Sequence, residues 1–199
     1  MSTGSAKAQL RTQLRETVAT AILEAAEDLI ASNGLEGAPL AQIAKRAGVA
    51  VGTLYNYFAD RDALIAALFE MRRATLRPQL RAAVTAGAAL GFEPRLRAFV
   101  RDAFAALDAH RKFVKVAIET EHHKLTPGTA SQDISSAVTD LVKVGIKEGV
   151  VASEHAELLS VAIISAIKGL ALKRISANAK LEAADADALV TLFLDGART

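Results

Sequence analysis

The chain of 199 residues has no cysteine and no tryptophan, and it contains only four prolines and two tyrosines. The absence of cysteine excludes disulfides, thiolate zinc sites and cysteine nucleophiles, and it favours a reducing compartment. Because alanine is abundant and helix-breaking residues are few, an all-α fold is favoured over a β-rich or disordered chain. The formal net charge is only +2, so no strong overall attraction to nucleic acid is expected.

Long apolar runs are absent as well. The first ten residues, MSTGSAKAQL, have no apolar core of signal-peptide length. The most apolar stretch, Leu158 to Ile167, is too short to span a bilayer. We therefore expect no membrane partner and a cytoplasmic location, for a chain long enough to bury one or two cores.

The segment from Pro39 to Phe58, PLAQIAKRAGVAVGTLYNYF, has the pattern of a helix-turn-helix. Apolar residues at helical spacing mark a first short helix, Gly48 ends it, and a second begins near Ala50. The second helix would turn Leu54 inward and project its other side chains, including both tyrosines of the chain, towards a DNA major groove. A hairpin buried in a bundle is the alternative, and two exposed tyrosines beside Thr and Asn fit it poorly.

The residues from about Thr17 to Leu68 resemble the DNA-binding domain of TetR-family transcriptional regulators. The matching runs are ILEAAEDLIASNG, IAKRAGV, GTLYNYF and DRDAL, in that order. The resemblance implies an all-α homodimer of about nine to ten helices per chain. Residues 1–60 would form a three-helix helix-turn-helix domain, and residues 61–199 a helical ligand-binding and dimerisation domain. It also implies binding to a palindromic double-stranded DNA operator, most simply as a repressor, with release by a small-molecule effector.

DNA-contacting residues follow from the motif positions. Four would face base edges or adjacent phosphates: Val51, Gly52, Thr53 and Tyr55. Three would hold the DNA backbone, namely Asn56, Tyr57 and Arg61, and Lys45 and Arg46 are further phosphate candidates. Lys7, Arg11 and Arg15 precede any acidic residue and could also meet phosphates, or could simply belong to a solvated surface of mixed charge.

The sequence departs from the family at Ala38, where a Thr or Ser usually caps the second helix. An alanine cap costs about 1 kcal/mol and removes a hydroxyl that could contact phosphate.

Helices are expected at about residues 15–32, 39–47, 51–57, from 61 onwards, 95–107, 110–123, 134–149, 154–175 and 184–197. Asp60 is expected to cap the fourth, Pro78 and residues 91–94 to punctuate the next stretch, and residues 124–130 to form a loop.

The helix expected at 154–175 is apolar around most of its circumference, so it needs cover on more than one side. A central helix within one subunit's core is one interpretation, and the other is a helix with one face on a partner. The family resemblance implies that the last two helices form a four-helix dimer interface. The candidate dimerisation residues are Leu159, Ile163, Ile167, Leu170, Leu189 and Phe193.

The C-terminal helices could enclose an apolar cavity, or the same side chains could pack the core. A cage for a cationic ligand is disfavoured, since both tyrosines lie in the helix-turn-helix and tryptophan is absent. We expect an aliphatic or weakly polar effector, oriented by Arg111, Glu119 or His123. The candidate lining residues are Leu68, Met71, Phe99, Phe104, Phe113, Val116, Ala117, Thr120 and Leu141.

No catalytic constellation, cofactor motif or complete metal site is present in the sequence. Glu119-x-x-His122 resembles half of a di-metal motif, but a single pair is more often a solvated helix end. The rival interpretation is a helical small-molecule carrier or metal-binding protein with an incidental helix-turn-helix. A third is a DNA-binding regulator that senses no small molecule.

Overall fold

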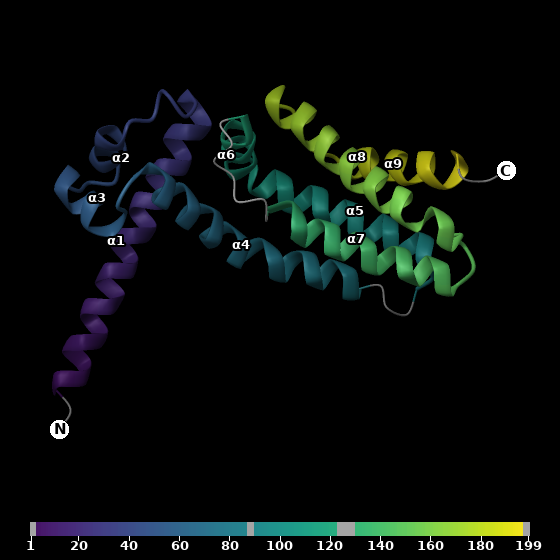
Figure 1. The fold of residues 1–199 in the computed structure, drawn as a ribbon, viewed down its shortest axis with the longest axis horizontal. Helices are drawn as coiled ribbons and strands as arrows, with labels where there is room; N and C mark the ends of the chain where they lie inside the picture. The colour runs from purple at the N-terminus through teal and green to yellow at the C-terminus, as the bar shows by residue number, and fades with distance from the viewer. Residues whose placement is uncertain (1–2, 87–89, 123–129, 197–199) are drawn as a thin grey trace. The chain divides into compact units, whose positions relative to one another are not determined.

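The computed structural model describes residues 3–86, 90–122 and 130–196. Within these residues the chain forms nine α-helices and one 3-10 helix and has no strand, which confirms the predicted all-α fold (Figure 1). The elements are α1 (Thr3–Asn33), α2 (Leu40–Arg46), α3 (Val51–Tyr57), α4 (Arg61–Ala86), α5 (Phe92–Ala109), α6 (Arg111–His122), α7 (Ala130–Lys147), η1 (Ser153–His155), α8 (Ala156–Ser176) and α9 (Ala183–Gly196). The loop expected at 124–130 lies outside the described residues, except for Ala130.

The chain divides into two compact units. The first comprises residues 1–71 and 116–126, and the second comprises residues 72–115 and 127–199. Two of the three points of division fall inside helices, in α4 and in α6, and the third lies outside the described residues. The functional boundary expected between residues 60 and 61 stays a prediction, because compactness alone does not define a function.

The core of the first unit joins α1, α2, α3 and the start of α4. Ile22, Ile43, Leu54 and Leu64 are almost completely buried. Ala44 is fully buried too, and its small side chain suits the close approach of α2 to its neighbours. These helices therefore hold α3 in a fixed position by burying one apolar stripe from each element.

Helix α1 begins at Thr3, about twelve residues before the predicted start. Residues 5–17 are all exposed and carry no inward apolar stripe, so hydrophobic periodicity could not reveal them. They are nevertheless rich in Ala, Gln, Leu, Lys and Arg, which favour helix. This segment therefore extends the packed part of α1 as a helix. In Figure 1 this segment extends well beyond α2 and α3.

The start of α4 agrees with the sequence, but its end does not. The side chain of Asp60 accepts a hydrogen bond from the Ala63 N–H at 2.7 Å, which confirms the predicted cap. Pro78, predicted to punctuate the stretch after the fourth helix, lies inside α4, which continues to Ala86. Leu80 and Ala83 are buried in the core of the second unit, and this packing holds the segment after the proline in the helix.

The beginning of α2 also differs in detail from expectation. Pro39, rather than Ala38, occupies the N-cap position, with extended backbone angles and no side-chain cap hydrogen bond. Ala38 is itself buried. The inference that α2 lacks a hydroxyl cap therefore holds, although the capping residue is the next one along.

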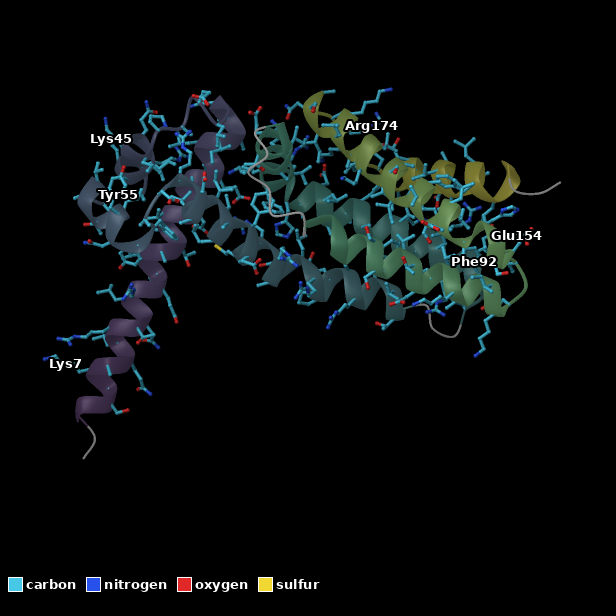
Figure 2. The ribbon with its side chains drawn as sticks, in the orientation of Figure 1. Lys7, Lys45, Tyr55, Phe92, Glu154 and Arg174 are labelled. Atoms are coloured by element: carbon cyan, nitrogen blue, oxygen red, sulfur yellow. The ribbon has the colours of Figure 1, made fainter. Side chains whose placement is uncertain are left out.

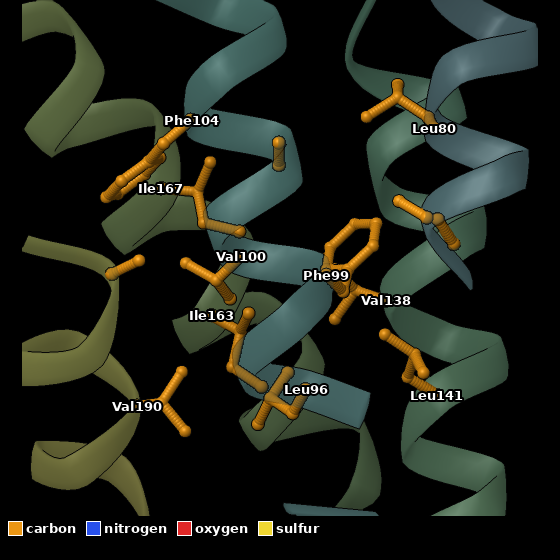
Figure 3. Close-up of a cluster of buried hydrophobic side chains, with 14 of the residues drawn as sticks. Leu80, Leu96, Phe99, Val100, Phe104, Val138, Leu141, Ile163, Ile167 and Val190 are labelled. Atoms are coloured by element: carbon orange, nitrogen blue, oxygen red, sulfur yellow. The ribbon is translucent and has the colours of Figure 1, made fainter. Parts of the chain in front are cut away.

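The second unit is organised around α5. Its apolar side chains Leu96, Phe99, Val100 and Phe104 belong to a buried cluster with side chains of α7, α8 and α9 (Figure 3). At one end of this unit, Gly145 of α7 leaves room for Phe92 and Val151: a Cβ placed there would lie 3.0 and 2.7 Å from their side chains. The close approach of these elements thus depends on a missing side chain.

Candidate nucleic-acid interface

A short turn joins α2 to α3 and fixes their crossing. Gly48 has a φ of +71°, a left-handed conformation that glycine adopts without steric cost. The Val49 N–H donates to the Ala44 carbonyl at 3.0 Å and satisfies a carbonyl at the end of α2. Ala50 then adopts extended angles as the N-cap of α3. The helix-turn-helix that the sequence predicts is therefore formed.

One side of α3 is buried and the other faces solvent. Leu54 is completely buried, whereas Tyr55 and Val51 are 52% and 42% exposed. Gly52 and Asn56 are also exposed, and a Cβ on Gly52 would have no atom within 4 Å. Figure 2 shows Tyr55 on this open side of the unit. Exposed aromatic and polar groups on a short helix are suited to contacting base edges.

The two remaining positions of this face, Thr53 and Tyr57, are half-buried. The guanidinium carbon of Arg15 lies 5.6 Å from the centroid of the Tyr57 ring, a cation–π geometry. The Tyr57 ring also lies near Phe58, with centroids 6.4 Å apart. Arg15 of α1 thus adjoins the end of α3. Sequence spacing gave no indication of this contact, because the two residues are 42 positions apart.

The three predicted phosphate ligands outside α3 differ in availability. Lys45 is exposed. Arg46 is also exposed but forms a 2.6 Å ion pair with Asp28 of α1, which offsets part of its charge. Arg61 is half-buried, and its guanidinium donates to the carbonyls of Leu35 and Ala38 at 3.3 and 3.0 Å. These hydrogen bonds hold the loop before α2, and the predicted contact of Arg61 with the DNA backbone stays a prediction.

The predicted effector-lining residues are divided between the two units. Leu68, Met71, Val116, Ala117 and Thr120 belong to the first unit, and Phe99, Phe104, Phe113 and Leu141 to the second. Phe99, Phe104 and Leu141 are packed in the core cluster of the second unit. The Thr120 hydroxyl is buried and donates to the Val116 carbonyl of its own helix at 2.9 Å. For these four, the core-packing alternative describes the observed environment.

The polar groups expected to orient an effector have other contacts as well. Arg111 donates to the Ala179 carbonyl at 2.9 Å and pairs with Asp108 at 3.5 Å, so it fixes the connection between α8 and α9. The carboxylate of Glu119 lies close to Gly34, with its Oε2 3.6 Å from where a Cβ would be. His123 lies outside the described residues.

The candidate dimerisation residues lie in two environments. Ile163 and Ile167 of α8 are 1% and 0% exposed within their own chain, where they belong to its core cluster. The other four, Leu159, Leu170, Leu189 and Phe193, are partly buried against the same core. Because α8 is apolar on nearly every side, its composition could not distinguish the inward face from the outward one.

The outward face of α8 and α9 carries four exposed large apolar side chains beside charged ones such as Lys168. The exposed side chains are Leu158, Val161 and Leu172 on α8 and Leu192 on α9, with exposed fractions between 43% and 72%. On α8 the small residues Ser165 and Gly169, which are exposed as well, lie between Val161 and Leu172. We call these four apolar side chains the outer apolar face.

The Glu119-x-x-His122 motif is only partly described by the structure. The side chain of His122 lies outside the described residues, and among the remaining residues no three His, Cys, Asp or Glu side chains are grouped so as to hold a metal ion. None of the described helices has the length and hydropathy needed to cross a bilayer.

Comparison with known proteins points to one family. Residues 22–68 match the model of bacterial regulatory proteins of the tetR family. Over 49 residues the chain is 47% identical to the uncharacterized HTH-type transcriptional regulator YvdT and 43% identical to the fatty acid metabolism regulator protein, both of Bacillus subtilis. Each of these matches covers 25% of this chain and 25% of the relative. The chain therefore spans only a quarter of the length of these relatives.

The fold is similar over a much longer part of the chain. The crystal structure of the transcriptional regulator FadR from Bacillus subtilis, in complex with stearoyl-CoA, superposes with a TM-score of 0.76 at 20% identity. The superposition covers 89% of this chain and 98% of that one. Residues 22–68, which include the exposed face of α3, thus match the tetR family of bacterial regulatory proteins, and the described helices share the fold of the FadR structure.

Proposed function

We propose that the protein is a transcriptional regulator, most directly a repressor, that binds a palindromic operator as a homodimer. The observation that carries the proposal is the exposed side of α3, on which Val51, Gly52, Tyr55 and Asn56 face solvent. A carrier or metal-binding protein has no use for such a face. The turn at Gly48 and the buried Leu54 fix α3 in a position from which its exposed side can enter a major groove.

The proposed roles follow from exposure. Val51, Gly52 and Tyr55 contact base edges or the nearest phosphates, with Thr53 beside them. Gly52 lets the backbone of α3 approach the DNA closely, because nothing fills the space where its side chain would be. Asn56, Tyr57 and Lys45 contact the DNA backbone and set the register of α3.

A palindromic operator requires two copies of α3 related by twofold symmetry. We propose that a second copy of this chain covers the outer apolar face. The exposed apolar side chains of α8 and α9 provide the hydrophobic centre of such an interface, and Ser165 and Gly169 allow close helix crossing. No other described element combines several exposed large aliphatic residues with small ones in this way.

The experiment is selection of bound fragments from genomic DNA by the purified full chain, followed by titration of a selected duplex at several salt concentrations. The proposal predicts a shared site with two inverted half-sites. It also predicts that affinity falls steeply with salt, since phosphate contacts release counterions. Recovery of random fragments only, or affinity that does not depend on salt, would reject it.

For the effector we propose a compound with a long aliphatic chain, such as a fatty acyl thioester. Two similar proteins support this class: a fatty acid metabolism regulator that matches the DNA-binding segment, and a FadR crystallised with stearoyl-CoA. Stearoyl-CoA should weaken operator binding and raise the melting temperature, whereas coenzyme A alone should do neither. By linkage, operator DNA must weaken stearoyl-CoA binding by the same factor.

The alternatives correspond to other outcomes of that titration. DNA binding unaffected by stearoyl-CoA or by shorter acyl thioesters would reject the proposed effector class and favour a regulator that senses no such molecule. Acyl thioester binding without any DNA binding would instead favour the helical carrier.

A further inference from the structure

The exposed N-terminal part of α1 carries a row of basic side chains on one side of the helix. Lys7, Arg11 and Arg15 are spaced four residues apart, and all three are exposed. Since an α-helix turns about 100° per residue, each lies about 40° around the axis from the one before. The row therefore occupies less than a quarter of the circumference and about 12 Å of helix length. We call these three residues the basic stripe.

Acidic groups do not neutralise the basic stripe. In the part of the chain that the structure describes, no carboxylate pairs with Lys7 or Arg11. The nearest acidic residue in sequence is Glu16, which the helix geometry places about 140° around the axis from Arg11. The other faces of this segment are instead occupied by neutral polar residues, including Gln9, Thr12 and Gln13.

The basic stripe leads directly to α3. Arg15, at its inner end, lies over the ring of Tyr57, the last residue of α3. From there the stripe continues along the extension of α1 to Lys7, which Figure 2 labels near the end of the helix and away from α2 and α3. The positive row is thus continuous with the face proposed to read DNA, and it extends beyond that face.

We propose that the basic stripe binds DNA phosphates outside the base pairs read by α3, as a rigid helical arm that lengthens the contact with the operator's flanks. Phosphates of one strand follow each other every 3.4 Å along the duplex axis, so a row of about 12 Å matches about three of them. Phosphate contacts carry no base information. The arm therefore adds affinity for all sequences and leaves specificity to α3. This inference rests on the proposed function.

An anionic membrane surface is the other partner that a basic amphipathic helix can bind. Leu10 and Leu14 lie beside the stripe and are 67% and 64% exposed. DNA is favoured because the row ends at Tyr57 on the reading helix, and two leucines provide only a small apolar surface for lipid. A duplex backbone can accommodate both groups, since sugars offer apolar contact beside the phosphates.

The test moves the charges without changing their number. In one full-length variant, Lys7→Gln with Gln9→Lys and Arg11→Gln with Gln13→Arg transfer two positive charges to the opposite side of α1. A second variant removes the stripe, with Lys7, Arg11 and Arg15 all changed to Ala. The matched control removes three exposed lysines of the second unit, Lys112, Lys143 and Lys147. Circular dichroism verifies that all variants keep their helix content.

Affinity for the selected operator and for a scrambled duplex is then measured by fluorescence anisotropy as a function of salt. Removing the stripe should weaken the affinity for both duplexes by a similar factor. It should also lower the salt slope by about 2 to 3 per protomer, or 0.9 for each lost phosphate contact. The relocated variant should behave almost like the variant without the stripe, and the control should retain the wild-type slope. Phosphate ethylation should no longer interfere at the operator's flanks when the stripe is absent.

If the relocated variant binds DNA as tightly as the wild-type protein, the proposed arm is wrong, because the number of positive charges would then matter and their position would not. Loss of affinity for phosphatidylglycerol vesicles, with unchanged DNA binding, would overturn it in favour of a membrane contact. If the wild-type chain binds no duplex at all, the proposed function itself fails. Normal operator binding by the variant without the stripe rejects the arm alone.

Discussion

Arg61 donates hydrogen bonds to the carbonyl oxygens of Leu35 and Ala38, at 3.3 and 3.0 Å, from the first turn of α4. These carbonyls belong to the loop that precedes α2, so one side chain fixes the entry to the helix-turn-helix. A charged donor to a carbonyl contributes about 1.5–3 kcal/mol when its environment is partly buried. Arg61 therefore stabilises the loop that leads into the helix-turn-helix.

Arg61→Ala should destabilise the folded chain by about 1.5–3 kcal/mol, because two loop carbonyls lose their donor. Urea unfolding of the full-length protein measures this directly. Arg81→Ala, an exposed position later in α4, is the control and should change the free energy of unfolding by less than about 0.5 kcal/mol. A stable Arg61→Ala protein with weakened binding to every duplex would instead restore the phosphate-binding role.

Gly145→Ala should destabilise the chain by about 1–3 kcal/mol. The added methyl group would lie 2.7 Å from the Val151 side chain and 3.0 Å from the Phe92 ring, which are both buried. Gly52→Ala, inside α3, is the control, because its Cβ meets no atom within 4 Å and alanine favours helix by up to about 1 kcal/mol. Thermal unfolding should show opposite shifts for the two variants. A shift to higher melting temperature in both would show that the packing around Gly145 is looser than described.

Acid should weaken the contact between α5 and α9. The hydrogen bond from Arg101 to Asp187, 2.6–2.8 Å long, together with its opposite charge, holds the pKa of Asp187 below its ordinary value. A lowered pKa in the folded state contributes stability above the unfolded pKa, near about 3.9, and loses it as the pH falls through the folded pKa. Asp187→Asn should therefore be less stable than wild type at neutral pH.

The difference in unfolding free energy between wild type and Asp187→Asn should shrink as the pH is lowered from about 5 to below about 3. Urea titrations at a series of pH values measure it. Asp140→Asn is the control, since Asp140 bonds an exposed lysine of its own helix. A difference that stays constant across this range would mean that the Arg101 contact does not stabilise the fold through its charge.

Leu158→Asp combined with Leu192→Asp should convert the dimer to a folded monomer. Both side chains are about 70% exposed in one chain, so a charge there leaves the subunit fold intact but disrupts an apolar interface. Sedimentation velocity at micromolar concentration gives the oligomeric state. Leu90→Asp, at an exposed leucine outside α8 and α9, should remain a dimer. A wild-type monomer, or a double variant that stays dimeric, would reject the outer apolar face as the interface.

The helix-turn-helix could be predicted from the sequence because its apolar spacing, Gly48 and the cap at Asp60 are all local features. Local features could not assign Arg61 or Arg46, since their partners lie 18 to 26 positions away. Local features also could not predict the first twelve residues of α1, because this exposed part of the helix has no periodic apolar stripe. Ile163 and Ile167, predicted at the dimer interface, pack the core of their own chain. Because α8 is apolar in nearly every direction, only the packed structure separates its two faces.

Replacement of Tyr55 tests most directly whether α3 reads DNA sequence through its exposed face. The measurement is the affinity of wild type and Tyr55→Ala for the selected operator and for a scrambled duplex, at one fixed salt concentration. Val150→Ala, an exposed position in the second unit, serves as the control. A lost base contact costs about 1–3 kcal/mol. Tyr55→Ala should therefore bind the operator about 5- to 150-fold more weakly and the scrambled duplex almost unchanged, whereas equal affinity of the wild-type protein for both duplexes would contradict the account.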